Sequence, residues 1–221
     1  STEPAITSTL AGFYQGTGTA QPFYRAACAG LDGKPAVIFG FEDVLETVGQ
    51  SATELYATAA GVDGWDQAGH LNAGSIAMAM STTAWSAVET PGNAHVSATR
   101  GSATSSTGRS NNLSGIRSDG SVNSQNNNST GISSAGPYSR TPGLHVLILT
   151  WPGDTTTATV SLYVDSDTPV ATGTAGATKT HTGKGILRQY GAIGEVIFLH
   201  GTQMTDADAA QLRAYWRGVY E

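Results

Sequence analysis

The sequence predicts an all-β fold, an antiparallel sandwich of two sheets that ends in one short α-helix. Short apolar runs recur between Gly, Pro, Asn and Asp residues, which is the pattern of strands joined by turns. The best-defined run, 160–165, alternates apolar and polar residues with a period of two. A single amphipathic segment follows at 205–219. A chain of 221 residues fits one such sandwich as a single domain.

Residues 1–22 are predicted to form an N-terminal arm, and residues 23–221 the sandwich domain. The arm contains scattered Gly and Pro and has no sustained hydrophobic period. Its large side chains, between Ile6 and Tyr14, are spaced too irregularly for a strand and are too few for a stable isolated helix. We therefore expect the arm to become ordered by lying against another chain.

Two buried strands are predicted in the first part of the domain. Residues 35–39 form an apolar run that ends at a glycine, and in residues 75–80 the side chains of Ile76, Met78 and Met80 share one face. Helix is the alternative for the second segment because Ala and Met favour helices. The flanking glycine and threonines favour a strand.

Residues 97–136 are rich in Ser and Asn and contain few large apolar side chains. Leu113 and Ile116 precede Asp119–Gly120, a dipeptide that is typical of a hairpin turn. We interpret the segment as polar edge strands joined by long loops, and disorder is the alternative.

The last third contains the clearest strands. Residues 144–151 are predicted to be a central strand, and residues 160–165 its hairpin partner after a turn at 152–154. Residues 193–199 predict another buried strand. The expected core residues on these strands are Val146, Ile148, Leu162, Val164, Val196 and Phe198.

A helix is predicted at residues 205–219. Thr205 and Asp208 have the spacing of a capping box, with an acid in the first turn. The apolar residues that follow recur at i, i+3, i+4 and i+7, so they are expected to line one face that docks on the sheets. These residues are Leu212, Tyr215, Trp216 and Val219.

The composition argues against several classes of protein. The formal net charge is −6 and 13% of residues are charged, so the basic stripe of a nucleic-acid-binding protein is absent. No apolar run approaches the roughly 18 residues of a membrane helix, so we expect no membrane insertion. Cys28 is the only cysteine, which excludes an internal disulfide. No signal-peptide pattern is visible. The abundance of Ser, Thr, Asn and Gly fits a protein on a virion, on a cell surface or outside a cell.

Three groups of motifs follow one another along the chain. They are Gly30–Phe39 with Glu42–Leu45, then Pro142–Val146 with Ser161–Asp165, and finally Gly194–Phe198 with Met204–Asp208 and Leu212–Tyr215. In this order, over about residues 28–220, they resemble segments of concanavalin A-like, laminin-G-like jelly-roll domains. The sequence departs from that pattern at Ser166–Pro169, where the family often has a tight Asp-Gly turn, and in its Ser/Asn-rich centre. The resemblance implies a jelly-roll sandwich.

The resemblance implies several kinds of function, since this fold occurs in lectins, glycan-binding modules, glycoside hydrolases and structural domains. Modules of the family often belong to bacterial surface proteins or to bacteriophage tails and capsids. We therefore expect a non-enzymatic virion or surface module that binds carbohydrate or docks to partner proteins, as a homo-oligomer or within a larger assembly. The alternatives are a structural decoration protein without a sugar ligand, and a glycoside hydrolase or lyase.

Carbohydrate binding requires an aromatic ring for the apolar face of a sugar and polar groups for its hydroxyls. Two tryptophans and a tyrosine stand in or beside loop-like stretches, whereas Trp151 and Trp216 lie on core-facing patterns. The candidate ligand-binding residues are Trp65, Asp66, His70, Trp85, Arg109, Asn111, Asn112 and Tyr138. Core or rim packing is the alternative for Trp65 and Trp85.

Neither catalysis nor metal binding is expected. Retaining glucanases place carboxylates at i, i+2 and i+4 of one strand, whereas the middle position between Glu42 and Glu46 is valine. The five histidines form no i, i+4 pair, which argues against a helical zinc site. Asp154, Asp165 and Asp167 flank one hairpin at its two ends, so we expect no cofactor, with calcium as the alternative.

Overall fold

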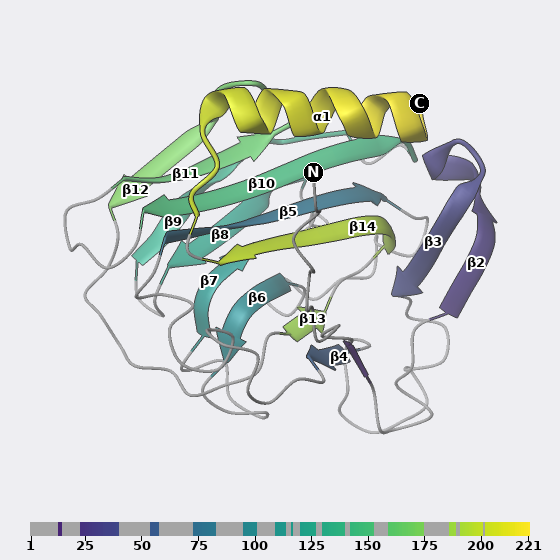
Figure 1. The fold of residues 1–221 in the computed structure, drawn as a ribbon, viewed down its shortest axis with the longest axis horizontal. Helices are drawn as coiled ribbons and strands as arrows, with labels where there is room; N and C mark the ends of the chain where they lie inside the picture. The colour runs from purple at the N-terminus through teal and green to yellow at the C-terminus, as the bar shows by residue number, and fades with distance from the viewer. Residues whose placement is uncertain are drawn as a thin grey trace, which may run out of the picture.

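The computed structural model consists of two packed β-sheets and a C-terminal helix (Figure 1). Within the part of the chain that the structure describes, each sheet has seven strands, and every strand pairs antiparallel with its neighbours. The fold class, an all-β sandwich with one terminal helix, is therefore confirmed. The structure describes residues 13–14, 23–39, 54–57, 73–82, 95–100, 109–113, 116, 120–126, 130–139, 142–152, 159–174, 186–188, 191–200 and 202–221.

We call the two sheets A and B. Sheet A has the order β1-β4-β13-β6-β7-β8-β9, and sheet B has the order β12-β11-β10-β5-β14-β3-β2. The strands of sheet A are β1 (Phe13–Tyr14), β4 (Glu54–Ala57), β13 (Ile186–Arg188), β6 (His95–Arg100), β7 (Arg109–Leu113), β8 (Val122–Asn126) and β9 (Thr130–Ala135). Those of sheet B are β12 (Ala171–Thr174), β11 (Thr159–Val164), β10 (Leu144–Pro152), β5 (Ala73–Ser81), β14 (Gly191–His200), β3 (Lys34–Phe39) and β2 (Phe23–Cys28). A short 3-10 helix, Ala29–Leu31, joins β2 to β3, and α1 spans Asp206–Tyr220.

The main core lies between the two sheets. Met78 of β5 and Leu147 of β10 are register partners at the centre of sheet B, and both are fully buried. They pack with Leu113 and Val122 of sheet A in one apolar cluster. Complete burial of a side chain of this size contributes roughly 1.5–3 kcal/mol, so this cluster holds the sheets together.

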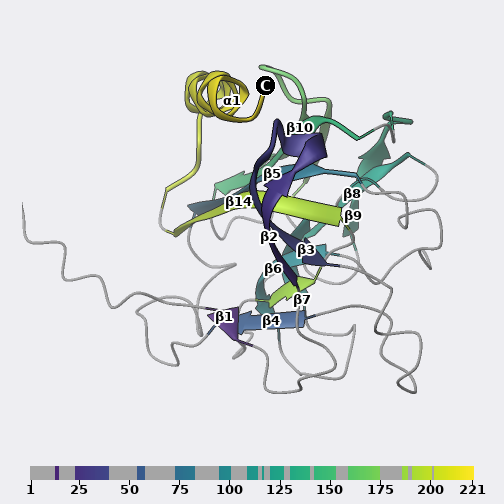
Figure 2. The same cartoon turned by 90° about the vertical axis from the view of Figure 1, so that its right-hand side faces the viewer.

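The opposite face of sheet B is buried beneath α1. The β5 residues on this face are Ala77 and Ala79, whose small side chains let the helix approach the sheet. Trp216 of α1 is fully buried in the same cluster. Figure 2 shows the resulting layers, with α1 and sheet A on opposite sides of sheet B.

The predicted core residues divide between these two clusters. Leu162 and Val164 lie between the sheets as predicted, and Val196 packs against the same cluster. Val146 and Ile148 are also buried, but they face α1, and Leu147 faces sheet A instead. Their burial in the core is as predicted, but the sequence does not indicate which face each takes, because a strand buried on both sides is apolar at every position. Nothing is described of the Phe198 side chain.

The polar segment 97–136 contains strands, as interpreted from the sequence, but most of them are not edge strands. β6, β7 and β8 lie inside sheet A, and β9 alone of the four is at its edge. β7 and β8 pair as a hairpin, and their inward residues Leu113 and Val122 are fully buried. A few well-placed apolar residues therefore suffice to fix polar strands on a core.

Part of the predicted N-terminal arm also joins a sheet. Phe13 and Tyr14 form β1 and pair with β4, so the expectation that no strand forms in residues 1–22 is wrong at this point. A two-residue strand is too short to produce a period in the sequence. The other arm residues lie outside the described part of the chain, and the role of the arm stays a prediction.

The predicted helix is confirmed with its capping box. The Thr205 side chain accepts a hydrogen bond from the Asp208 backbone, and the Asp208 carboxylate accepts one from the Thr205 backbone. The predicted apolar face is correct at Trp216, which is buried, and at Leu212 and Val219, which pack against the same cluster. It is wrong at Tyr215, which is 59% exposed, whereas Ala209 and Tyr220 complete the buried stripe. Within the described residues, no helix is long and apolar enough to span a membrane.

Candidate functional site

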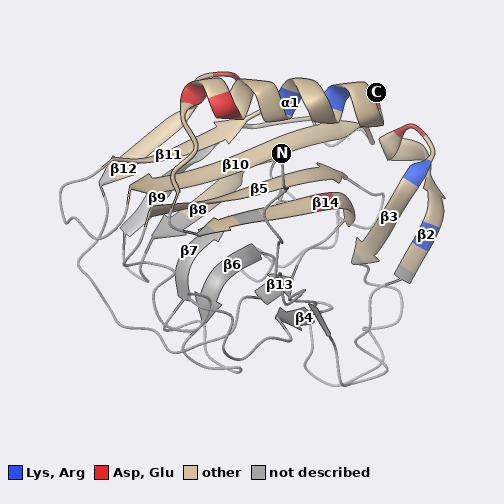
Figure 3. Ribbon diagram, in the orientation of Figure 1, with Lys and Arg blue, Asp and Glu red and all other residues tan. Residues whose placement is uncertain are grey.

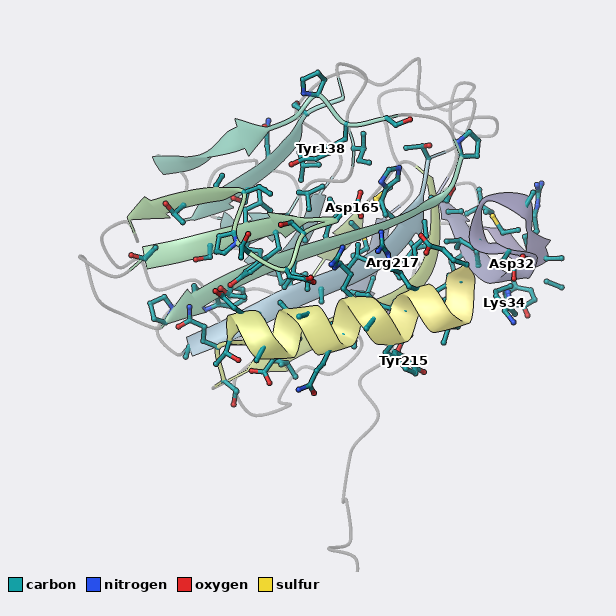
Figure 4. All side chains as sticks on the ribbon, turned by 90° about the horizontal axis from the view of Figure 1, so that it is seen from above. Asp32, Lys34, Tyr138, Asp165, Tyr215 and Arg217 are labelled. Atoms are coloured by element: carbon teal, nitrogen blue, oxygen red, sulfur yellow. The ribbon has the colours of Figure 1, made fainter. Side chains whose placement is uncertain are left out.

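The candidate functional site is a rim of the sandwich where β10 begins and β11 ends. Three side chains mark it: Tyr138 from the segment after β9, His145 at the start of β10, and Asp165 directly after β11. Figure 4 shows Tyr138 and Asp165 on the same flank of α1, with Tyr215 on the other flank. We call this set of three residues the rim site.

Asp165 is fixed by hydrogen bonds to the beginning of β10. One carboxylate oxygen lies 2.7 Å from Nδ1 of His145, and the other accepts a 2.7 Å hydrogen bond from the Val146 backbone N–H. The Asp165 backbone N–H donates in turn to the Val146 carbonyl. Its φ of 51° is left-handed, a conformation that Asp tolerates better than most residues. The carboxylate therefore has a defined position, and its side chain is still 31% exposed.

α1 holds the loop that follows Asp165. Arg213 donates through Nε to the Asp167 carboxylate at 2.7 Å and through a terminal nitrogen to the Asp165 carbonyl at 3.0 Å. The Thr168 N–H donates to the Ser166 hydroxyl within the loop. A guanidinium fork that binds two points of one loop restricts its movement, so Asp165 is presented on a rigid support.

Tyr138 supplies the aromatic ring of the rim site. Its backbone N–H donates to the Gly120 carbonyl at 2.8 Å. A Cβ at Gly120 would come within 2.8 Å of the Tyr138 carbonyl oxygen, so only glycine lets the two backbones come close enough for this hydrogen bond. The ring is half-buried against the core between the sheets. Burial, and then the negative charge of Asp165, raises the pKa of the Tyr138 phenol, so the phenol lies within electrostatic range of the carboxylate.

The rim site thus combines a partly exposed aromatic ring with a partly exposed carboxylate. A ring can stack on the apolar face of a sugar, and a carboxylate accepts hydrogen bonds from two of its hydroxyls. Neutral, hydroxyl-rich ligands suit it better than anions, because Arg213 is already paired with Asp167. Figure 3 shows the charges along α1: acids lie in its first turn and arginines further along, and this arrangement complements the helix dipole.

Of the three aspartates considered as possible calcium ligands, the structure describes Asp165 and Asp167. Both have protein partners: Asp165 binds His145 and Val146, and Asp167 binds Arg213. Within the described ranges, no three His, Cys, Asp or Glu side chains are grouped as metal ligands would be. Asp154, at the other end of the hairpin, lies outside the described residues.

The structure locates half of the predicted ligand-binding residues. Tyr138 is in the rim site. Arg109, Asn111 and Asn112 belong to β7, where the backbone of Asn112 pairs with Ser97 and Gln125, but their side chains are not described. The other predicted residues lie outside the described part of the chain: Trp65, Asp66, His70 and Trp85. Apart from the position of Tyr138, the site therefore stays a prediction.

Sequence reasoning did not associate Asp165 with Tyr138. Asp165 was considered only as a calcium ligand, and His145 was not selected as a binding residue. The signal in the sequence was an Asp that ends an alternating strand, because Asp and Asn are the residues that turn a strand out of its sheet at positive φ. Which aromatic ring would meet that carboxylate depends on long-range packing.

Comparisons with known proteins find a solved structure of similar fold but no matching family. Neither a family model nor a curated protein sequence matches the chain. A solved structure that it resembles is the crystal structure of the binding domain of Paraclostridial Mosquitocidal Protein 1, with a TM-score of 0.59 and 6% sequence identity. The match covers 93% of this chain and 48% of that chain, so this chain spans about half the length of its structural neighbour. At this identity the likeness shows a shared fold.

Proposed function

We propose that the protein is a non-enzymatic carbohydrate-binding module and that the rim site binds a neutral sugar. The observation that carries the proposal is that the half-buried Tyr138 ring and the fixed Asp165 carboxylate lie on the same flank of α1, on loops held by Gly120 and Arg213 (Figure 4). The sugar stacks on the ring and donates hydroxyl hydrogen bonds to Asp165. The shared fold with a toxin binding domain supports a binding role for the module.

We further propose that the module acts on a virion or an outer surface and that it catalyses no reaction. The composition and the resemblance to concanavalin A-like, laminin-G-like jelly rolls support a place on a virion or an outer surface. Both oxygens of the Asp165 carboxylate already accept hydrogen bonds from the protein, which suits binding better than acid–base catalysis. Glu42→Gln and Glu46→Gln should therefore leave sugar binding unchanged, and no polysaccharide should be hydrolysed.

A glycan array followed by calorimetry on the best ligand tests the proposal. The wild type should bind at least one neutral glycan, and Tyr138→Ala and Asp165→Asn should each weaken that binding at least tenfold. Tyr24→Ala is the matched control, because Tyr24 is 71% exposed on β2 and belongs to no described cluster. Thermal melting of each variant separates lost binding from lost folding.

Three results would each contradict a part of the proposal. If the folded wild type binds no glycan on the array, the protein is better explained as a structural decoration component. If it binds a glycan and Tyr138→Ala leaves the affinity unchanged, the module binds sugar elsewhere and the rim site is the wrong place. Release of reducing ends from a polysaccharide would overturn the non-enzymatic part.

A further inference from the structure

A second group of polar and aromatic side chains lies where β14 passes beneath the end of α1. In β14 the register shifts between Ile193 and Glu195, so that Ile193 pairs with Met80 and Glu195 with Ala79. Gly194 is the extra residue of this β-bulge. Without the bulge, strand alternation would put Glu195 on the face that carries Ile193, between the two sheets. The bulge instead brings the carboxylate to the face that carries α1.

The Glu195 carboxylate is half-buried and has no cationic partner among the described residues. One oxygen accepts a 2.7 Å hydrogen bond from Nε1 of Trp216. The ion pairs of the described residues join His145 to Asp165, Arg213 to Asp167 and Arg217 to Glu221, and none includes Glu195. A partly buried negative charge without a counter-charge is costly, so the site favours a cation.

Besides Trp216, a second aromatic ring of α1 lies next to this carboxylate, over the neighbouring glycine. A Cβ at Gly194 would come within 2.7 Å of the Tyr220 ring, so the ring passes directly over the bulge glycine. Burial, then the charge of Glu195 and then Tyr215 raise the pKa of the Tyr220 phenol, so both groups lie within electrostatic range of that phenol. Tyr215 itself is 59% exposed and gives the group access to solvent. Figure 4 shows Tyr215 on the flank of α1 opposite the rim site.

We propose that Glu195, Tyr215 and Tyr220 form a site for a quaternary ammonium group. The carboxylate supplies the opposite charge, and the exposed ring of Tyr215 supplies a π face that attracts a cation, while the buried Tyr220 ring packs over the bulge glycine beside the carboxylate. A primary ammonium would leave hydrogen-bond donors without acceptors, since it carries three and the site offers few oxygens. A trimethylammonium group has no donors and loses little on leaving water. This site is separate from the rim site and does not depend on sugar binding.

Choline is the probe, and the Trp216 indole N–H resonance is the reporter because it is hydrogen-bonded to Glu195. Choline should shift this resonance saturably, with a millimolar dissociation constant. Its neutral isostere 3,3-dimethylbutan-1-ol should not. Glu195→Gln keeps an oxygen that accepts from Trp216 and removes the charge, so the variant should fold and bind choline at least tenfold more weakly.

Tyr215→Ala should weaken choline binding by a similar factor. Because the Tyr215 side chain is exposed, this variant should fold like the wild type. Tyr24→Ala and Asp165→Asn are the controls and should bind choline like the wild type. The proposal is overturned if millimolar choline produces no saturable shift, if the neutral isostere binds equally well, or if folded Glu195→Gln binds with unchanged affinity.

Discussion

Nδ1 of His145 lies 2.7 Å from a carboxylate oxygen of Asp165, and this pair joins the start of β10 to the end of β11. Because a carboxylate only accepts hydrogen bonds, Nδ1 carries the proton. Nε2 of the same ring is buried and has no hydrogen-bond partner among the described residues. Asp165 therefore sets the orientation of the imidazole, and it also binds the Val146 N–H, so that one side chain closes the hairpin.

Asp165→Ala should lower the free energy of unfolding by about 3 kcal/mol, because it removes two hydrogen bonds to an ionised acceptor and places Ala at positive φ. Asp165→Asn should cost about 1 kcal/mol, since its carbonyl still accepts from Val146. Asp167→Ala is the control, and loss of its exposed pair with Arg213 should cost less than about 1 kcal/mol. Urea unfolding measures all three. Equal losses for the Ala and Asn variants at position 165 would contradict this role.

The fold was predictable where a local period exists. The hairpin of β10 and β11 and the capped helix α1 follow from alternation and from the Thr205–Asp208 spacing. The face of β10 was not predictable, because Val146 and Leu147 are both apolar and the choice depends on α1 covering sheet B. β1 was missed because its pairing with β4 is a long-range contact of two residues.

The sites were less predictable than the fold. Tyr138 was selected as an aromatic residue in or beside a loop-like stretch, but Asp165 follows a strand that is distant in the sequence, and neither local composition nor spacing relates the two residues. Glu195 had a local signal, a Gly-Glu pair inside an otherwise apolar strand. That signal indicates a bulge only once the register with β5 is known.

Gly194→Ala should destabilise the protein by about 1–3 kcal/mol, because the new methyl group would meet the Tyr220 ring at 2.7 Å. Gly218→Ala is a matched control on α1. Nothing lies within 4 Å of a Cβ there, and Ala is favoured over Gly in a helix by roughly 1 kcal/mol, so this variant should be more stable than the wild type. Opposite shifts in melting temperature are expected, and a neutral Gly194→Ala would mean that Tyr220 can move aside freely.

Tyr163→Phe tests the contact between sheet B and the start of α1. The Tyr163 hydroxyl donates a 2.6 Å hydrogen bond to Asp206, and its loss should cost about 1 kcal/mol at neutral pH. Burial, followed by the Asp206 interaction, raises the pKa of the Tyr163 phenol. A raised folded-state pKa gives stability that is complete below the unfolded value of about 10 and is lost as the pH rises above it. The wild type should therefore lose more stability than the Phe variant in alkaline melts, and parallel curves would exclude the effect.

The capping box of α1 predicts that the protein loses stability in acid, whereas Tyr163 predicts a loss in alkali. The Asp208 carboxylate accepts from the Thr205 backbone N–H at 2.8 Å and from its hydroxyl at 2.7 Å, and these bonds lower the pKa of Asp208. A lowered folded-state pKa gives stability that is present above the unfolded value of about 4 and is lost as the pH falls through the folded value. Asp208→Asn should thus melt below the wild type at neutral pH, and the two melting temperatures should converge in acid. Thr205→Ala should cost about 1 kcal/mol, whereas Thr205→Ser keeps the hydroxyl and should cost much less. A gap between wild type and Asp208→Asn that stays constant down to acidic pH would show that the charge of Asp208 does not stabilise the helix start.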